Sequence, residues 1–488
     1  MIAGRSGSRR AVLFFVTALF LAGMPFGGPA RAASRIGQAG WFAQGRRPEP
    51  EEWLEPEEWL EPPVCAGRLE QGTKALPADR ERALREGGVY NMYPEVPASL
   101  AEKVPCGYKP FYISHFGRHG ARYNVGGYER MYEWLEGSHA AGALTPFGES
   151  VRERYVRMYP TVRKREGDLA FKGQAQQDGI ALRMYRRYRP VFRRRAARVE
   201  AVSSTSGRCI MTMNAFCHRL TMEQPSLPVR MDVGERYNAY MRPSSASNPH
   251  YGPSGAIRKS GPAHDAYEAD HERLRARFDP DPFVQRLFAD PAYADSLCKG
   301  DRRALADEFY YLVASTPCID YEEDFHDIFT PEEWHALWEA DSFQYYANFG
   351  PGSYFKGLQW AIADTLLSDF IVKAEEDIAA GDVAARLRFG HDTGLMSLLT
   401  LLGAEGFSTP AARAEDAAAV WQNWRFTMSV NLQWIFYRNR RGDILVRILL
   451  NEQDLGLPVG EGPCYEWPAL RAWCQERLAL ANHLLQSE

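Results

Sequence analysis

The segment Arg118-His119-Gly120-Ala121-Arg122 places a histidine between two arginines, which are residue types that phosphoryl transfer requires. A neutral imidazole is a competent nucleophile near physiological pH, and guanidinium groups stay charged and match the geometry of phosphate oxygens. Gly120 lets the backbone approach an anion closely, which a side chain would hinder. The motif predicts that His119 attacks a phosphoryl group held by Arg118 and Arg122. Taken alone, it also fits a solvated basic turn.

A second polar pair follows a strand predicted at residues 384–389. His391 can donate a hydrogen bond to a phosphoryl oxygen, and a protonated Asp392 can give its proton to the leaving alcohol. An aspartate at a helix start also serves commonly as an N-cap. Arg208, at the end of a strand predicted at 199–202, adds a third guanidinium. Taken alone, Arg208 is only an exposed arginine.

The elements that must position these residues alternate between strands and helices. A buried strand at 111–114 precedes RHGAR, helices are predicted at 179–188 and 358–376, and 430–437 pairs with 443–450 in a hairpin. This alternation predicts an α/β fold, with a mostly parallel sheet covered by helices on both faces. Ligands of such sheets bind at the carboxyl ends of strands, where the candidate residues fall.

The chain divides into five expected parts. Residues 1–32 form a signal peptide, and 33–85 form an acidic low-complexity extension that contains PEEWLE twice in tandem. Residues 86–225 and 346–488 are the two parts of the α/β core. Residues 226–345 have little strand signal and are expected to form an inserted, mainly helical cap.

The leader carries Arg5, Arg9 and Arg10, then an apolar run at 11–24, then a small-residue cleavage site at 30–32. This order is typical of secretory signals, so we expect an exported protein, periplasmic or extracellular. The apolar run is too short for a membrane span, and no later run replaces it. The even number of cysteines, 8, then favours disulfides. Sequence proximity pairs Cys65 with Cys106, Cys298 with Cys318 and Cys464 with Cys474, although connectivity cannot be deduced from sequence.

Composition bounds the partners of the protein. The 488 residues are 45% hydrophobic, enough for a large core, and removing four leader arginines changes the formal charge from −4 to −8. A mildly acidic protein is a poor candidate for nucleic-acid binding.

Cysteine spacing matches no zinc site, and we expect no cofactor. The basic run from Arg183 to Arg198 either attracts a polyphosphorylated substrate or is a solvated face. The oligomeric state stays open.

Residues 87–94 read GGVYNMYP and 107–122 read GYKPFYISHFGRHGAR. With Arg208 and the His391-Asp392 pair, these stretches resemble the histidine acid phosphatases, the branch of the histidine phosphatase superfamily that holds phytases and multiple inositol polyphosphate phosphatases. They are most similar to its bacterial exported members. The resemblance implies a phosphohistidine at catalytic His119 and catalytic Asp392 as the acid, with no metal. It also implies an α/β core with an inserted helical cap. The phosphate-binding residues that it implies are Arg118, Arg122, Arg208 and His391.

Two positions depart from the family pattern. Many members have proline where this chain has Asn124, and the inositol polyphosphate phosphatases typically have HAE where it has His391-Asp392-Thr393, the form of phytases and acid phosphatases. We expect an exported phosphomonoesterase acting on inositol polyphosphates or similar small phosphates. The alternatives are a mutase-like phosphotransferase, a non-catalytic phosphate-ligand binding protein of the cell envelope, and a structural envelope protein that binds through PEEWLE.

Overall fold

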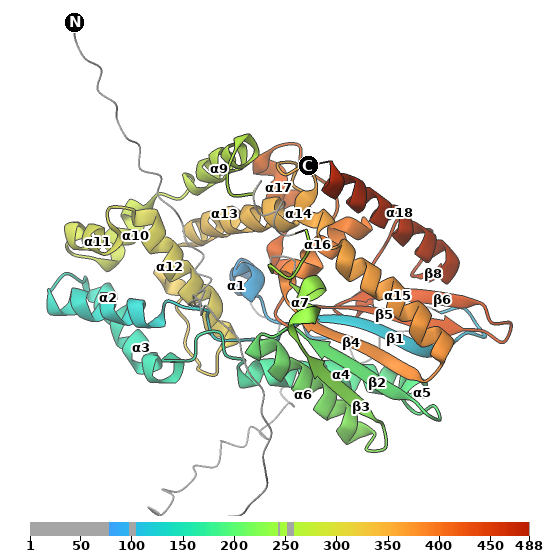
Figure 1. Cartoon of the computed structure of the whole chain (residues 1–488). Coiled ribbons are helices and arrows are strands. Elements are labelled where there is room, and N and C mark those ends of the chain that lie inside the picture. The colour runs from blue at the N-terminus through green and yellow to red at the C-terminus, as the bar shows by residue number, and fades with distance from the viewer. Residues whose placement is uncertain (1–77, 97–103, 243–244, 251–257, 488) are drawn as a thin grey trace, which may run out of the picture. The chain divides into compact units, whose positions relative to one another are not determined.

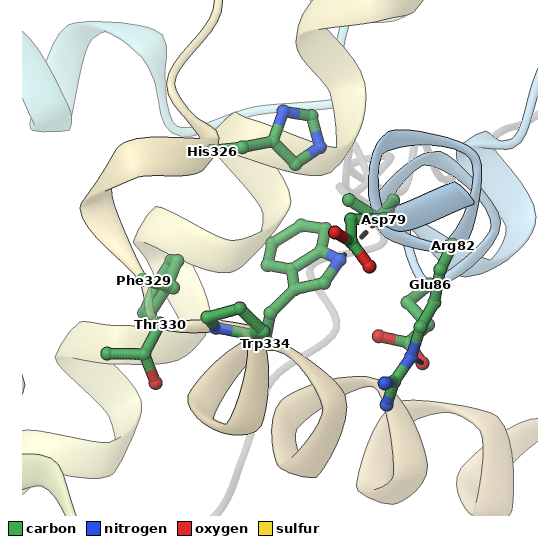
Figure 2. Close-up of a pocket in the computed structure, with 9 residues that line it drawn as sticks. Asp79, Arg82, Glu86, His326, Phe329, Thr330 and Trp334 are labelled. Atoms are coloured by element: carbon green, nitrogen blue, oxygen red, sulfur yellow. Dashed lines mark hydrogen bonds and ion pairs between the residues drawn. The ribbon is translucent and has the colours of Figure 1, made fainter. Parts of the chain in front are cut away.

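The computed structural model describes residues 78–96, 104–242, 245–250 and 258–487, which lie within one compact unit. The expected signal peptide, both PEEWLE copies and residues 33–77 of the expected extension lie outside the described residues. The last part of that extension forms helix α1 (Ala78–Arg85), which packs against α13 (Pro331–Phe349). Trp334 Nε1 donates to Ala83 O at 2.9 Å, beside a pocket of about 150 Å³ that contains none of the predicted site residues (Figure 2).

A single sheet runs through the unit in the order β3-β2-β4-β1-β5-β6-β7, with β8 also paired to β6 (Figure 1). The first four strands in this order are mutually parallel: β3 (Val229–Val233), β2 (Arg198–Ser203), β4 (Val383–Gly390) and β1 (Lys109–Arg118). The others extend the sheet antiparallel: β5 (Asn431–Arg438), β6 (Ile444–Leu450), β7 (Gln453–Asp454) and β8 (Cys464–Glu466). The α/β class and the 430–450 hairpin are confirmed.

Helices cover both faces of the sheet (Figure 1). One face packs on α4 (Phe171–Arg187) and α6 (Gly207–Glu223), with Ile113 and Leu387 in its core. The other face lies in the core that includes α15 (Asp364–Ala380), α16 (Asp392–Leu402) and α18 (Trp467–Gln486), where Phe370 and Trp434 have ring centroids 5.2 Å apart. Because both faces are covered, β1 and β4 are apolar along most of their length instead of alternating.

A helical region accompanies the sheet and draws on more of the chain than the expected insertion. The adjoining segments 144–145 and 287–288 form a bridge, with Thr145 N donating to Leu287 O at 3.0 Å. Conversely, β3 lies inside the expected insertion yet pairs with β2 at the sheet edge. The expected domain boundaries stay predictions. The helices of this region are α2 (Tyr128–Ala140), α3 (Pro146–Val162), α9 (Pro262–Arg275), α10 (Pro280–Leu287), α11 (Pro291–Cys298) and α12 (Arg302–Ser315), together with α13.

Short helices complete the described chain. The helix predicted at 358–376 is divided, because the chain turns between α14 (Leu358–Ala361) and α15. The remaining short helices are α5 (Arg189–Phe192), α7 (Glu235–Met241) and α17 (Ala417–Val420). Across the described ranges, no helix combines the length and apolarity that a membrane span needs.

Within the described residues, two of the expected disulfides do not form. Cys298, Cys318 and Cys474 carry free thiols, which excludes the pairs Cys298–Cys318 and Cys464–Cys474. The pair Cys65–Cys106 includes Cys65, which lies outside the described residues. Cys318 Sγ instead donates to Tyr90 O at 3.1 Å, and Cys298 Sγ donates to Ala294 O at 3.3 Å within its own helix. Buried Cys318 and Cys474 therefore pack as small apolar residues.

Candidate active site

The adjacent parallel strands β1 and β4 end side by side, with Arg118 opposite Gly390. His119 N donates to Gly390 O at 3.1 Å, so the residue after β1 is tied to the end of β4. His391 is then the N-cap of α16, and Asp392 is its first residue. Parallel pairing thus brings RHGAR and the His391-Asp392 pair to one edge of the sheet, as the sequence predicted.

Five of the predicted side chains each contact another predicted side chain. The rings of His119 and His391 have centroids 5.6 Å apart, and Arg118 Nη2 lies 2.8 Å from Asp392 Oδ2. Arg208 Nη2 lies 3.5 Å from His391 Nδ1. Arg208 belongs to the first turn of α6 and not to a strand end, because β2 stops at Ser203.

His119 is held as a neutral imidazole with one nitrogen available. Its side chain is almost fully buried, and Nδ1 lies 3.0 Å from Gly120 O. A carbonyl oxygen can only accept, so Nδ1 carries the proton and Nε2 keeps the lone pair. Burial and the charges of Arg208 and Arg118 hold the pKa of His119 well below its usual range. The nucleophile-capable nitrogen is therefore Nε2.

Arg118 is fixed by backbone carbonyls and by the predicted acid. Its Nη1 donates to Val89 O at 2.6 Å and to Phe426 O at 2.9 Å, while Nη2 pairs with Asp392. The side chain is only 1% exposed, so its charge is desolvated and its direction is set. Arg118 thus orients Asp392 as well as adding positive charge beside His119.

Arg122 and Arg208 have no carboxylate within ion-pair distance among the described residues. Arg122 Nη1 donates to Tyr123 O at 3.0 Å, and its guanidinium carbon lies 5.2 Å from the centroid of the Tyr90 ring. Burial and the neighbouring Arg122 lower the pKa of Arg208. Two buried or half-buried cations without acidic partners make a site that favours an anion.

His391 is also neutral and lies between donors and acceptors from β2 and α6. Its Nε2 is 3.4 Å from Ser204 Oγ and 3.7 Å from Cys209 Sγ. Burial, followed by the charges of Arg208 and Arg242, lowers the pKa of His391 well below its usual range. Helices α6 and α16 both begin here, and helix N-termini add positive potential for an anion.

Two glycines hold the RHGAR loop against α4. A Cβ on Gly120 would lie 2.4 Å from Gly173 O, and a Cβ on Gly173 would lie 2.2 Å from Ala121 O. Thr212 Oγ1 also accepts from Gly120 N at 3.1 Å, and Gln176 Oε1 accepts from Ala121 N at 2.9 Å. The close approach required of Gly120 is therefore to the protein's own backbone.

Sequence reasoning missed the turn that supports Arg118. Gly88 has a φ of +60°, and a Cβ there would lie 2.8 Å from Asn423 Nδ2. Asn423 in turn donates to Asp341 Oδ2 at 2.7 Å, and burial raises the pKa of Asp341 to about 7. This network fixes the segment that ends in Val89 O. The available signal was the GGVY string, which entered only through the family resemblance.

A surface pocket of about 480 Å³ adjoins Arg208. The turn around Gly167 forms one wall, since a Cβ on Gly167 would lie 3.7 Å from Arg208 Nη1. That turn is anchored to the RHGAR segment, with Ala170 N donating to Ala121 O at 2.9 Å. The pocket leaves space beside Arg208 for part of a bound molecule. Its other lining residues are Glu166, Asp168, Leu169, Gln174, Gly207 and Met211.

In the basic run from Arg183 to Arg198, the arginines with defined contacts bind other parts of the protein and not this site. Arg183 Nη2 lies 2.7 Å from Glu452 Oε1, and Arg187 Nη1 lies 3.9 Å from Glu452 Oε2. Arg194 donates to two backbone carbonyls at 2.9 Å each, and Arg198 pairs with Glu200 at 2.7 Å. These arginines hold parts of the fold together.

The family model of the histidine phosphatase superfamily (branch 2) matches residues 115–451. The chain belongs to this family. It is therefore a histidine-type phosphatase, as the RHGAR, Arg208 and His391-Asp392 pattern indicated. The match spans both expected parts of the core and the region between them.

Solved structures share the fold of this phosphatase. The multiple inositol polyphosphate phosphatase of Bifidobacterium longum, in complex with inositol hexasulfate, has a TM-score of 0.66 at 18% identity, covering 78% of this chain and 96% of that one. The phytase from D. castellii has a TM-score of 0.57 at 15% identity, covering 82% of this chain and 85% of that one. No curated protein sequence matches the chain.

Proposed function

We propose that this phosphatase hydrolyses phosphate monoesters through a phosphohistidine formed on Nε2 of His119. The observation that carries the proposal is the buried, neutral His119, whose Nδ1 is hydrogen-bonded to Gly120 O and whose pKa is lowered by Arg208 and Arg118. Such a nitrogen is unprotonated and surrounded by the positive charge that a phosphoryl group needs.

The reaction has two balanced steps. In the first, Nε2 forms a bond to phosphorus, the bond from phosphorus to the ester oxygen breaks, and Asp392 gives its proton to the leaving alcohol. In the second, Asp392 takes a proton from water, whose oxygen attacks phosphorus and breaks the bond to Nε2. Arg118, Arg122, Arg208 and His391 bind the phosphoryl oxygens in both steps.

The substrates we propose are inositol polyphosphates or similar small organic phosphates. The family membership and the names of the fold relatives support this choice. The leader-like sequence at residues 1–32 supports export to the periplasm or the outside of the cell.

Phosphate release from inositol hexakisphosphate and a panel of sugar and aryl phosphates tests the proposal. We expect hydrolysis that a chelator does not remove and that His119→Ala lowers by at least about 10³-fold, because the covalent route is lost. His218→Ala is the matched control, since His218 is an exposed histidine of α6. Activity that requires a divalent metal would contradict the mechanism.

The acid role of Asp392 has its own test. Asp392→Asn should slow esters with poor leaving groups more than activated aryl esters, since only the former need a proton on the leaving oxygen. Equal losses on both classes would assign Asp392 to another role, such as holding Arg118.

The alternative, a phosphate-ligand binding protein without turnover, makes an opposite prediction. Rapid mixing with an aryl phosphate would then give no burst of alcohol and no phosphoenzyme, and His119→Ala would leave ligand affinity nearly unchanged. Trapping of acid-labile phosphate on the protein decides between the two functions.

A further inference from the structure

Helix α7 lies across the carboxyl ends of β2 and β4. Asn238 Oδ1 accepts from Thr205 N at 3.2 Å, and its Nδ2 donates to Thr205 Oγ1 at 2.9 Å. At the end of the helix, Met241 O lies 3.1 Å from the position of a Cβ on Gly390. The next residue, Arg242, is therefore placed beside the strand end that leads into His391.

The guanidinium of Arg242 is half-buried and has no carboxylate within ion-pair distance among the described residues. Arg242 directly follows Met241, whose carbonyl oxygen packs on Gly390, and Gly390 directly precedes His391. In agreement with this placement, burial, followed by the charges of Arg208 and Arg242, lowers the pKa of His391.

The transferred phosphoryl group already has three guanidinium groups around His119. Arg242 is a fourth arginine near His391, it has no acidic partner, and it follows α7, which carries none of the other three. Such an arginine can bind an anion on another part of the same substrate. We propose that Arg242 binds a second phosphate on the alcohol part of the substrate and so favours polyphosphorylated alcohols over monophosphates. This inference rests on the proposed phosphomonoesterase function.

Inhibition of aryl phosphate hydrolysis by inositol hexasulfate tests it without requiring turnover of the inhibitor. Arg242→Ala should raise the inhibition constant for inositol hexasulfate about tenfold, the loss expected for one charge-assisted contact. Arg242→Lys should recover part of that affinity. The inhibition constant for inorganic phosphate should rise much less, because phosphate occupies only the phosphoryl site.

Arg236→Ala is the matched control, because Arg236 is an exposed arginine of α7 that pairs with Asp232. It should leave both inhibition constants unchanged. The inference is overturned if Arg242→Ala leaves hexasulfate inhibition unchanged, or if both constants rise equally, which would assign Arg242 to the phosphoryl site. Arg242→Gln repeats the test if the alanine variant does not fold.

Failure of the proposed function gives a different result. In that case His119→Ala would keep aryl phosphate hydrolysis, whatever the inhibition constants. Calorimetric titration of inositol hexasulfate into wild type and Arg242→Ala then still measures the contribution of Arg242 to anion binding.

Discussion

Two groups of arginines in this protein differ in what neutralises them. Arg183 and Arg187 meet the buried Glu452, and Arg198 meets Glu200. Arg122 and Arg208 lie beside His119 and His391 without a carboxylate partner in the described chain. In the first group, carboxylates of the protein neutralise the arginines. In the second group, an anionic ligand has to supply the negative charge.

This difference separates structural from functional charge better than clustering along the sequence does. The basic run is denser in arginine than RHGAR, yet four of its arginines make contacts that hold segments of the fold together, namely Arg183, Arg187, Arg194 and Arg198. Arg118 is intermediate, because its one acidic partner is Asp392, itself a predicted member of the site. A paired arginine should therefore affect stability, and an unpaired one should affect phosphate chemistry.

The largest expected effect is on turnover. Arg208→Ala should lower kcat about 10²–10³-fold with little change in thermal stability, because it removes a fixed cation from the developing phosphoryl charge. Steady-state hydrolysis of an aryl phosphate measures this. Arg198→Ala, which removes the pair with Glu200, should change kcat less than twofold. Similar kcat losses in both variants would remove the distinction between the two groups.

Stabilisation of the protein by bound phosphate should depend on the arginines without a carboxylate partner. Inorganic phosphate at a hundred times its Kd should stabilise the folded state by about 2.7 kcal/mol, and the increase in Tm reports it. At the same phosphate concentration, Arg208→Ala should lose most of this increase in Tm, because the variant lacks a positive charge that binds phosphate. A variant that kept the full phosphate-dependent increase would show that Arg208 does not contact the anion.

The stability of the protein without ligand should depend on the arginines that pair with carboxylates. Arg183→Ala should lower the free energy of unfolding by roughly 2 kcal/mol, because Glu452 is only 2% exposed and would lose its bidentate partner. Chemical denaturation measures this, with the exposed Arg230→Ala as control. Activity at a temperature where the variant stays folded should be unchanged. A large fall in kcat with normal stability would place Arg183 in the functional group.

The smallest expected effect is on pH dependence. Burial, followed by the positive charge of Arg208, lowers the pKa of His119, so wild type should keep its nucleophile unprotonated well below pH 6.5. Arg208→Ala favours the imidazolium, raises the pKa of His119, and should move the acid limb of kcat/KM to higher pH. Arg198→Ala should leave that limb in place. An acid limb that stays fixed in Arg208→Ala would indicate that another group controls it.

The sequence was sufficient to predict the site residues that directly follow a strand in the chain. RHGAR and His391-Asp392 each follow a strongly apolar strand, and parallel pairing of those strands brings the motifs together. The edge strand β3 was missed because its five residues alternate apolar and charged side chains and Arg230 to Val233 are exposed, so it lacks the apolar run that marks the central strands. Burial marks central strands far better than edge strands.

Contacts between distant segments could not be predicted. Glu452 lies 269 positions after Arg183, so nothing near the basic run indicates that its charge is neutralised. The same limit explains why Cys298 does not pair with Cys318, nor Cys464 with Cys474, because sequence proximity does not fix the distance between two cysteines. Arg242 was missed for a related reason: its relevance depends on α7 crossing the ends of β2 and β4.

The contact between Gly120 and Gly173 has a consequence for comparing sequences. Each position excludes any residue with a Cβ, because that Cβ would overlap the backbone of the opposite segment. A substitution at either site cannot be tolerated unless the loop and α4 separate. The third letter of RHGAR and the residue fifty-three positions later should therefore both stay glycine, and a search that requires both glycines should separate true relatives from chance occurrences of the short motif.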